Sequence, residues 1–411
     1  MLADRGSARS TSLAITGVTA ALMMIGVVTV ASAAASLDVP LLSGSLWNSA
    51  FGRQLVFAAL GFAALLVFAR VGCRLFAWRP ASRWQPAVLL VLLAGICLTA
   101  TLLPSIGLER HGARRWLTIG PQQYGLTFQP SELAKVALVV FLSAFLADRS
   151  ERIRSVRGAL LPALAVIAML SALVGVEDFG TAALLGTVGG VMLLAAGCRI
   201  VHLLPAALPG FAGAAYLVYS ESYRLERLTS FFHIWADPQG AGYHPIQSLA
   251  TIASGGWFGL GLGAGVQKYG YLPASRTDFI FSVLCEEAGL LGGLVVILLF
   301  VALLLLGLRT MRRADGAQPR LLAFGVTLLI CLQAVMNIAV VTVMAPTKGI
   351  ALPFVSAGGS GVVFLGAMVG MLAGVARGAG PGWCESAKAQ TRGSYSAIKT
   401  PRDGFLRGGV T

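Results

Sequence analysis

Apolar and polar residues are separated into long blocks along the chain. Ten blocks approach the roughly 20 apolar residues that a helix needs to cross the hydrocarbon core of a bilayer. The expected spans are residues 12–34, 53–70, 87–106, 131–147, 159–176, 180–197, 203–219, 280–308, 321–345 and 359–377. The pattern therefore predicts an all-α polytopic membrane protein with about ten transmembrane helices.

Composition supports the same fold class. Of the 411 residues, 56% are hydrophobic and only 12% are charged, and the mean hydropathy is +0.79. A soluble globular protein carries about 25% charged residues. The chain is therefore expected to fold in a membrane.

The net charge of +14 has two interpretations, a nucleic-acid partner or a membrane topology signal. The positions of the basic residues decide between them. Arg70, Arg149, Arg309, Arg312 and Arg313, among others, follow spans that run inward when the N-terminus is cytoplasmic. Basic residues stay on the cytoplasmic side of a membrane. We expect both termini in the cytoplasm and no nucleic-acid partner.

The chain divides into a short cytoplasmic N-terminus (1–11), a membrane domain (12–377) and a basic tail (378–411) that we expect to be cytoplasmic and disordered. The stretch "ASAAAS" after the first apolar block resembles a signal-peptide cleavage site. That block is as long as a span, whereas the apolar region of a signal peptide has about 7–15 residues. We favour an uncleaved first helix. Cleavage would leave nine spans in the same orientation.

Two external connections are long, residues 107–130 and residues 220–279 between the seventh and eighth spans. The second contains "IQSLATIASGGWFGLGLGAG", which is too rich in glycine for a confident span. We expect it to be re-entrant or interfacial, with its backbone protected by packing. A phosphate-binding loop is the alternative for these glycines, but the strand–loop–helix context is absent.

Charged residues at the outer ends of spans are the first candidates for a site, because a charge within the bilayer costs about 2.5–3.5 kcal/mol at a helix centre. "QPSELAK" places Glu132 and Lys135 on one helical face. An ion pair that eases entry of the helix into the membrane is the alternative. "VEDFGTA" places Glu177 and Asp178 in a tight external turn, where they could also be ordinary solvated acids.

Two further segments add a cation and a carboxylate. "APTKGIALPFVSAGGSG" breaks any helix with its prolines and glycines and carries the isolated Lys348, which suits an anionic headgroup or pyrophosphate. A snorkelling lysine is the alternative. "RTDFIF" places Asp278 at the rim of the eighth span, as a reactive group or a helix cap. With Arg114 and Arg115, these residues predict an external site for an anionic lipid or a sugar.

Five segments resemble those of the SEDS family of bacterial shape, elongation, division and sporulation proteins, over residues 12–377. They are "GARRWLTIGPQQYGLTFQPSELAK", "EDFGTA", "GYHPIQSLATIASGGWFGLGLG", "YLPASRTDFIFSVLCEEAG" and "PTKGIALPFVSAGGSG". "PTKG" is closer to the FtsW-type division branch than to the RodA-type elongation branch. Arg276, Glu177, Ala357 and Gly361 depart from the family pattern.

The resemblance implies a peptidoglycan glycosyltransferase that polymerises lipid II on the outer face of the cytoplasmic membrane. It implies Asp278 as the catalytic base, which would accept the proton of the acceptor hydroxyl. The substrate-binding residues that it implies are Arg115, Trp116, Gln129, Glu132, Lys135, Asp178, Lys348 and Ser356.

The resemblance also implies a class B penicillin-binding protein as transpeptidase partner, alongside other division or elongation proteins. A divalent cation, Mg or Mn, at the pyrophosphate is left open. The six cysteines and four histidines have no metal-ligand spacing.

Two other functions share the many spans and the lipid-linked substrate: a lipid II flippase and a non-catalytic scaffold. A flippase needs polar groups on two alternately accessible faces. The predicted polar groups lie on the external side only, which favours catalysis.

Overall fold

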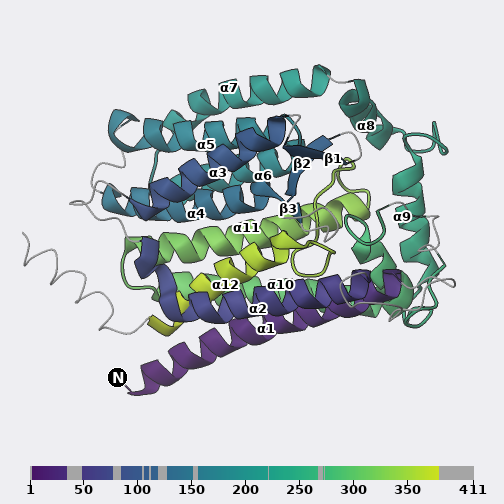
Figure 1. Cartoon of the computed structure of the whole chain (residues 1–411), viewed down its shortest axis with the longest axis horizontal. Coiled ribbons are helices and arrows are strands. Elements are labelled where there is room, and N and C mark those ends of the chain that lie inside the picture. Colours follow the sequence, from purple (N-terminus) through teal and green to yellow (C-terminus); the bar gives the residue numbers. More distant parts are fainter. Residues whose placement is uncertain are drawn as a thin grey trace, which may run out of the picture.

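The computed structural model describes residues 2–34, 49–76, 85–103, 106–110, 113–118, 127–150, 156–220, 222–266, 272 and 274–378. The helices are α1 (Leu2–Ala34), α2 (Ala50–Val71), α3 (Pro86–Leu102), α4 (Pro130–Asp148), α5 (Leu161–Gly175), α6 (Phe179–Ala195), α7 (Ile200–Tyr219), α8 (Ser222–Phe232), α9 (Tyr243–Ser254), α10 (Ile280–Arg313), α11 (Ala317–Val341) and α12 (Ser360–Gly378). Most of them lie side by side in one bundle, with α1 at one edge and α7 at the other (Figure 1).

The helices that form this bundle coincide with the expected spans, and the all-α polytopic class is confirmed. Seven helices in the described chain are long and apolar enough to cross a membrane. The apolar helices at 86–102 and 179–195 are shorter. The exact number of spans and the domain boundaries stay predictions. The expected tail from residue 379 onward and residues 119–126 of the first external connection lie outside the described residues.

The external connections contain structure that the apolar pattern did not predict. The first forms the antiparallel strands β1 (Gly107–Arg110), β2 (Ala113–Thr118) and β3 (Thr127–Phe128), in the order β1-β2-β3. The second contains α8 and α9. The six residues of β2 are all half-buried, so no apolar–polar alternation marks this strand in the sequence. Figure 1 shows the strands, α8 and α9 together at one end of the bundle.

The eighth expected span is not one continuous helix, because α10 is broken at Gly289 (φ 70°, ψ −175°). The glycine-rich segment after α9 packs against this break. The N–H groups of Leu260 and Gly261 donate to the carbonyls of Glu286 and Glu287, both at 3.0 Å. The N–H of Leu290 donates in return to Gly256 at 2.9 Å. The expectation that packing protects this segment's backbone is confirmed.

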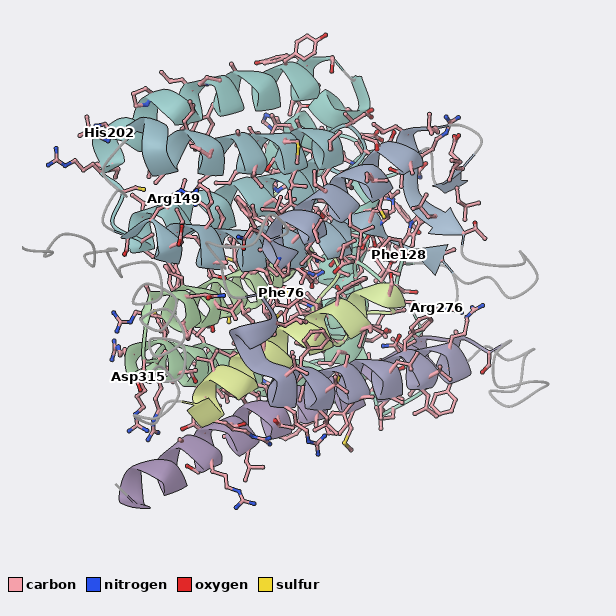
Figure 2. All side chains as sticks on the ribbon, turned by 60° about the vertical axis from the view of Figure 1, so that its left-hand side comes forward. Phe76, Phe128, Arg149, His202, Arg276 and Asp315 are labelled. Carbon is pink, nitrogen blue, oxygen red and sulfur yellow. The ribbon has the colours of Figure 1, made fainter. Side chains whose placement is uncertain are left out.

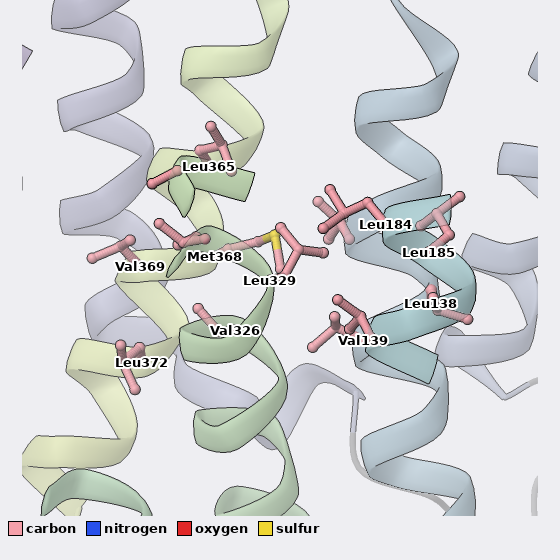
Figure 3. Close-up of a cluster of buried hydrophobic side chains, with 14 of the residues drawn as sticks. Leu138, Val139, Leu184, Leu185, Val326, Leu329, Leu365, Met368, Val369 and Leu372 are labelled. Atoms are coloured by element: carbon pink, nitrogen blue, oxygen red, sulfur yellow. The ribbon is translucent and has the colours of Figure 1, made fainter. Parts of the chain in front are cut away.

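The core lies between α4, α6, α11 and α12. Figure 3 shows leucine, valine and methionine side chains of these four helices meeting in one cluster. At the edge of this core, α2 and α12 approach until their backbones touch: a Cβ added at Gly366 would lie 2.2 Å from the carbonyl oxygen of Gly61. Small residues permit such approach between membrane helices. Helices α2 and α12 are therefore in close contact at Gly61 and Gly366.

The two ends of the bundle carry different residues. Phe128 and Arg276 lie at the end that holds the strands, while Arg149, His202 and Asp315 lie at the opposite end (Figure 2). Asp278, two residues after Arg276, and the connection 342–359 between α11 and α12 belong to the first end. The candidate residues of the sequence analysis therefore gather at the end expected to be external.

Candidate functional site

Asp278 lies in a turn directly before α10. The turn is closed by hydrogen bonds from the N–H groups of Thr277 and Phe279 to the carbonyl of Ala274, at 3.0 and 3.3 Å. The N-cap position of α10 is Phe279, whose side chain cannot accept a hydrogen bond. Asp278 therefore does not occupy the capping position, and its half-buried carboxylate needs another explanation.

The loop between α11 and α12 passes directly over this carboxylate. A Cβ added at Gly349 would lie 3.3 Å from Oδ2 of Asp278 and 3.6 Å from Nη1 of Arg115. The bare backbone of Gly349 thus lies between a carboxylate and a guanidinium that are far apart in sequence. Strand β2, the turn before α10 and the loop carrying Lys348 meet at this point.

Arg115 is held by the turn between α5 and α6. Its Nε donates to the carbonyl of Glu177 at 2.8 Å, and its Nη1 lies 4.0 Å from Oδ2 of Asp178. Asp178 is the N-cap of α6 and accepts from the N–H and the hydroxyl of Thr181 at 3.0 and 2.8 Å. Asp178 is buried, so it is not a solvated turn acid.

Lys348 is half-buried beside the same turn. Its Nζ lies 5.1 Å from the centroid of the Phe179 ring, within the range of a cation–π contact. Burial lowers the pKa of the Lys348 ammonium, and the negative charge of Asp178 partly offsets this effect. The lysine is thus a desolvated cation that a second anion would stabilise.

A second group of charged residues is more deeply buried than Asp278, Arg115 and Lys348. Lys135 is 2% exposed and pairs with Glu132 at 2.8 Å. Its Nζ also donates to Oε1 of Gln333 at 2.8 Å, and Nε2 of Gln333 donates to the carbonyl of Ala351 at 2.8 Å. The pair is therefore not a surface ion pair at a helix end. It connects α4, α11 and the Lys348 loop.

The remaining predicted binding residues have different surroundings. The Ser356 hydroxyl donates to the carbonyl of Thr277 and accepts from the N–H of Leu352, both at 2.7 Å, so it fastens the loop to the Asp278 turn. The N–H of Gln129 donates to Oγ of Ser360 at 3.2 Å. Trp116 follows Arg115 on β2, and successive strand residues point to opposite faces. Direct contact of these residues with a substrate stays a prediction.

Several buried polar groups near the site were missed by the sequence analysis. Gln333 and Asn337 are buried in α11, and Glu286 and Glu287 are buried where α10 breaks. For both pairs of residues, the sequence already contained a signal for a functional role: polar side chains inside a block of apolar residues. His244 was also missed; its ring stacks on Phe279 with centroids 6.0 Å apart, and burial, then the charge of Arg227, lower its pKa.

A family model described as "Cell cycle protein", which covers the FtsW, RodA and SpoVE proteins, matches residues 12–379. The chain belongs to this family. Among relatives, the stage V sporulation protein E of Bacillus subtilis (strain 168) is 38% identical over 79% of this chain and 86% of its own length. A probable peptidoglycan glycosyltransferase FtsW of Nitrosococcus halophilus (strain Nc4) is 40% identical over 86% of this chain and 89% of the relative.

Solved structures of FtsW/RodA/SpoVE-type proteins have the same fold. A chain of a peptidoglycan synthase complex, in which polymerization and crosslinking are coordinated, matches 89% of this chain and 98% of its own length, with a TM-score of 0.70 and 25% identity. The rod shape determining protein RodA of Thermus thermophilus matches 89% of this chain and 96% of its own length, with a TM-score of 0.59 and 26% identity.

Two of the residues that depart from the family pattern have local roles in this structure. Arg276 donates from Nε to the carbonyl of Ala33 at 3.1 Å, which ties the Asp278 turn to α1. Oε2 of Glu177 accepts from the N–H of Arg114 at 2.8 Å, which ties β2 to the turn before α6. Both side chains therefore fasten the site to a neighbouring element.

Proposed function

We propose that this chain is a peptidoglycan glycosyltransferase that polymerises lipid II on the outer face of the bacterial cytoplasmic membrane. The observation that carries the proposal is the convergence of Asp278 and Arg115 on Gly349, next to Lys348. A carboxylate beside two cations at a membrane surface suits a sugar that is linked to a lipid through pyrophosphate.

The reaction follows from the roles of these groups. The 4-hydroxyl of the acceptor sugar attacks the anomeric carbon of the donor, and Asp278 accepts the hydroxyl proton. The bond between the anomeric carbon and the pyrophosphate oxygen breaks as the new glycosidic bond forms. The departing undecaprenyl pyrophosphate gains negative charge, which Arg115 and Lys348 offset. A single displacement inverts the α-linked donor to a β linkage and needs no covalent intermediate.

A divalent cation at the pyrophosphate is part of the proposal. Mg²⁺ is usually held by one or two carboxylates together with substrate phosphates. In the part of the chain that the structure describes, no three His, Cys, Asp or Glu residues group to hold a metal. The pyrophosphate of the substrate would therefore supply most of the ligands of the ion.

The proposed topology places both termini in the cytoplasm, with the strands, α8 and α9 outside. The similar chain in a peptidoglycan synthase complex supports a class B penicillin-binding protein as partner, which would crosslink the strands that this chain makes. Other division or elongation proteins would join the same assembly. The similarity to an FtsW protein at 40% identity favours the division branch.

Substitution of Asp278 tests the proposed mechanism. Asp278→Asn keeps the size and hydrogen-bonding capacity of the side chain but removes the base, whose loss typically costs on the order of 10²–10⁴ in rate. We expect retained lipid II binding, near-normal thermal stability and almost no glycan polymer from purified labelled lipid II. The same assay with EDTA tests the divalent cation.

Asp237→Asn is a matched control, because Asp237 is an exposed acid of an external turn. It should polymerise at the wild-type rate. Vigorous polymerisation by Asp278→Asn would contradict the catalytic role of Asp278, and an unchanged rate in EDTA would remove the ion from the mechanism.

A further inference from the structure

Two buried amide side chains on α11 are not used by the reaction as described. Gln333 is 3% exposed and Asn337 is 1% exposed. Because they are four residues apart, they share one face of the helix. Helix α11 lies in the middle of the bundle, where it packs against α4, α6, α10 and α12. Amides inside a membrane helix require partners and are functional candidates by default.

Asn337 connects the two segments that carry the proposed reacting groups. Its Nδ2 donates to the carbonyl of Asp278 at 2.8 Å and to the carbonyl of Ile350 at 2.6 Å. A primary amide has two N–H donors, and both are used here. Since both partners are carbonyl oxygens, only the NH₂ end of the amide can face them. The amide orientation is therefore fixed by chemistry.

Gln333 holds the same loop one residue further on. Its Nε2 donates to the carbonyl of Ala351, while its Oε1 accepts from Lys135. The two residues after Gly349 are thus attached through their backbones to one rigid helix. Of these two amides, only Asn337 also reaches the Asp278 turn.

We propose that Asn337 is a positioning residue for glycosyl transfer. Its amide holds the turn of Asp278 and the loop of Lys348 at a fixed separation, so that the base faces the acceptor hydroxyl while the cation faces the pyrophosphate of the donor. The inference rests on the proposed function. Asn337 touches neither substrate nor reacting atoms, because both of its bonds go to backbone carbonyls.

Two variants of similar size remove the tether. Asn337→Asp places a carboxylate oxygen where the NH₂ group was, against two carbonyl oxygens, and Asn337→Leu removes all polar atoms. A misplacement of about 1 Å can cost on the order of 10²-fold in rate. We expect kcat per folded full-length protein to fall by about this factor in labelled lipid II polymerisation, with KM for lipid II nearly unchanged.

Thr327→Val is the matched control. Thr327 is also buried on α11, at 1% exposure, and its hydroxyl donates only within the helix, to the carbonyl of Ala323 at 2.7 Å. Valine keeps its shape and loses its hydroxyl. This variant should retain both kcat and KM, which separates loss of a buried polar group from loss of the tether.

Two further measurements separate positioning from folding. In a double-mutant cycle of Asn337→Asp with Lys348→Ala, the combined loss of kcat should be smaller than the product of the single losses, because a displaced lysine no longer contributes. Amide hydrogen exchange of residues 345–357 should be faster in Asn337→Leu than in the wild type, and unchanged in Thr327→Val. The exchange measurement does not depend on any activity.

The outcomes are distinguishable. A wild-type chain without polymerase activity would count against the proposed function, while faster loop exchange in Asn337→Leu would still support the tether. The inference would be overturned if both Asn337 variants polymerised lipid II at the wild-type rate and their loop amides exchanged as slowly as those of the wild type. Multiplicative losses in the double-mutant cycle, or failure of both variants to fold, would assign Asn337 to the fold and likewise overturn it.

Discussion

At the scale of single residues, the partial burial of Lys348 favours the binding of an anion by its ammonium group. Its ammonium is half-buried against Phe179 and close to Asp178. Burial removes water from the ammonium, so an anion such as pyrophosphate stabilises its charge more than it would stabilise a fully hydrated lysine. The same environment makes its charge sensitive to pH.

The pH dependence of turnover tests this role. Burial lowers the pKa of Lys348 from its ordinary value of 10.5, so the amine loses its charge at a lower pH than an exposed lysine. We expect turnover to fall on the alkaline side below pH 10.5, whereas folding stability should rise there, because the unfolded chain binds the additional proton. In Lys348→Arg the alkaline decline should move to higher pH, since guanidinium stays charged.

The measurement is a pH–rate profile of lipid II polymerisation, with thermal stability recorded at each pH. Lys348→Arg should be slower at its optimum, because a guanidinium does not reproduce the geometry of an ammonium. An alkaline limb that is identical in wild type and Lys348→Arg would assign the titration to another group.

At the scale of elements, the break in α10 decides how the second external connection is attached. Gly289 has a backbone conformation that is almost restricted to glycine, and a Cβ there would lie 2.4 Å from both the N–H nitrogen of Gly259 and the carbonyl oxygen of Trp257. The break in α10 is therefore the point at which the glycine-rich segment of the second connection docks.

Substitution at this break should be costly. We expect Gly289→Ala to destabilise the protein by on the order of 2–4 kcal/mol, from backbone strain together with displacement of the docked segment. The check is thermal unfolding in detergent. Gly190→Ala on α6 is the control, because an added Cβ there meets nothing within 4 Å. Equal stability of both variants would show that the docked segment can move aside freely.

The helices could be predicted from the sequence, but their connections could not. Each apolar block is a local signal, so its position follows from the chain alone. The hydrogen bond between Asn337 and Asp278 joins residues 59 positions apart, and that between Gln129 and Ser360 joins residues 231 apart. Such contacts depend on which helices pack together. The external placement of Lys348 and Asp278 is a prediction from the expected topology, whereas their convergence required the structure.

At the scale of the whole molecule, the bundle has one end with the site and one end with many basic residues. Arg149 lies at the end of α4, and Arg312 and Arg313 lie in the last turn of α10. The strands, α8, α9 and the loop at 342–359 lie at the opposite end (Figures 1 and 2). Retention of basic residues in the cytoplasm predicts which end faces outward.

Single cysteines introduced into a cysteine-free chain test this orientation. Gln239 lies in the exposed external connection, and Ala317 lies exposed at the start of α11. We expect an impermeant thiol reagent to label Gln239→Cys in intact cells and to label Ala317→Cys only after permeabilisation. Labelling of both from one side would contradict the bundle topology.

The connection between α11 and α12 has a consequence for the time at which the protein becomes active. It carries Lys348 and Gly349 and comes near the end of the described chain, after Arg115, Asp178 and Asp278 have already been synthesised. A nascent chain on the ribosome can therefore have Arg115, Asp178 and Asp278 in the membrane before Lys348 and Gly349 have been synthesised. We expect polymer synthesis only after α11 and the connection that follows it have been inserted.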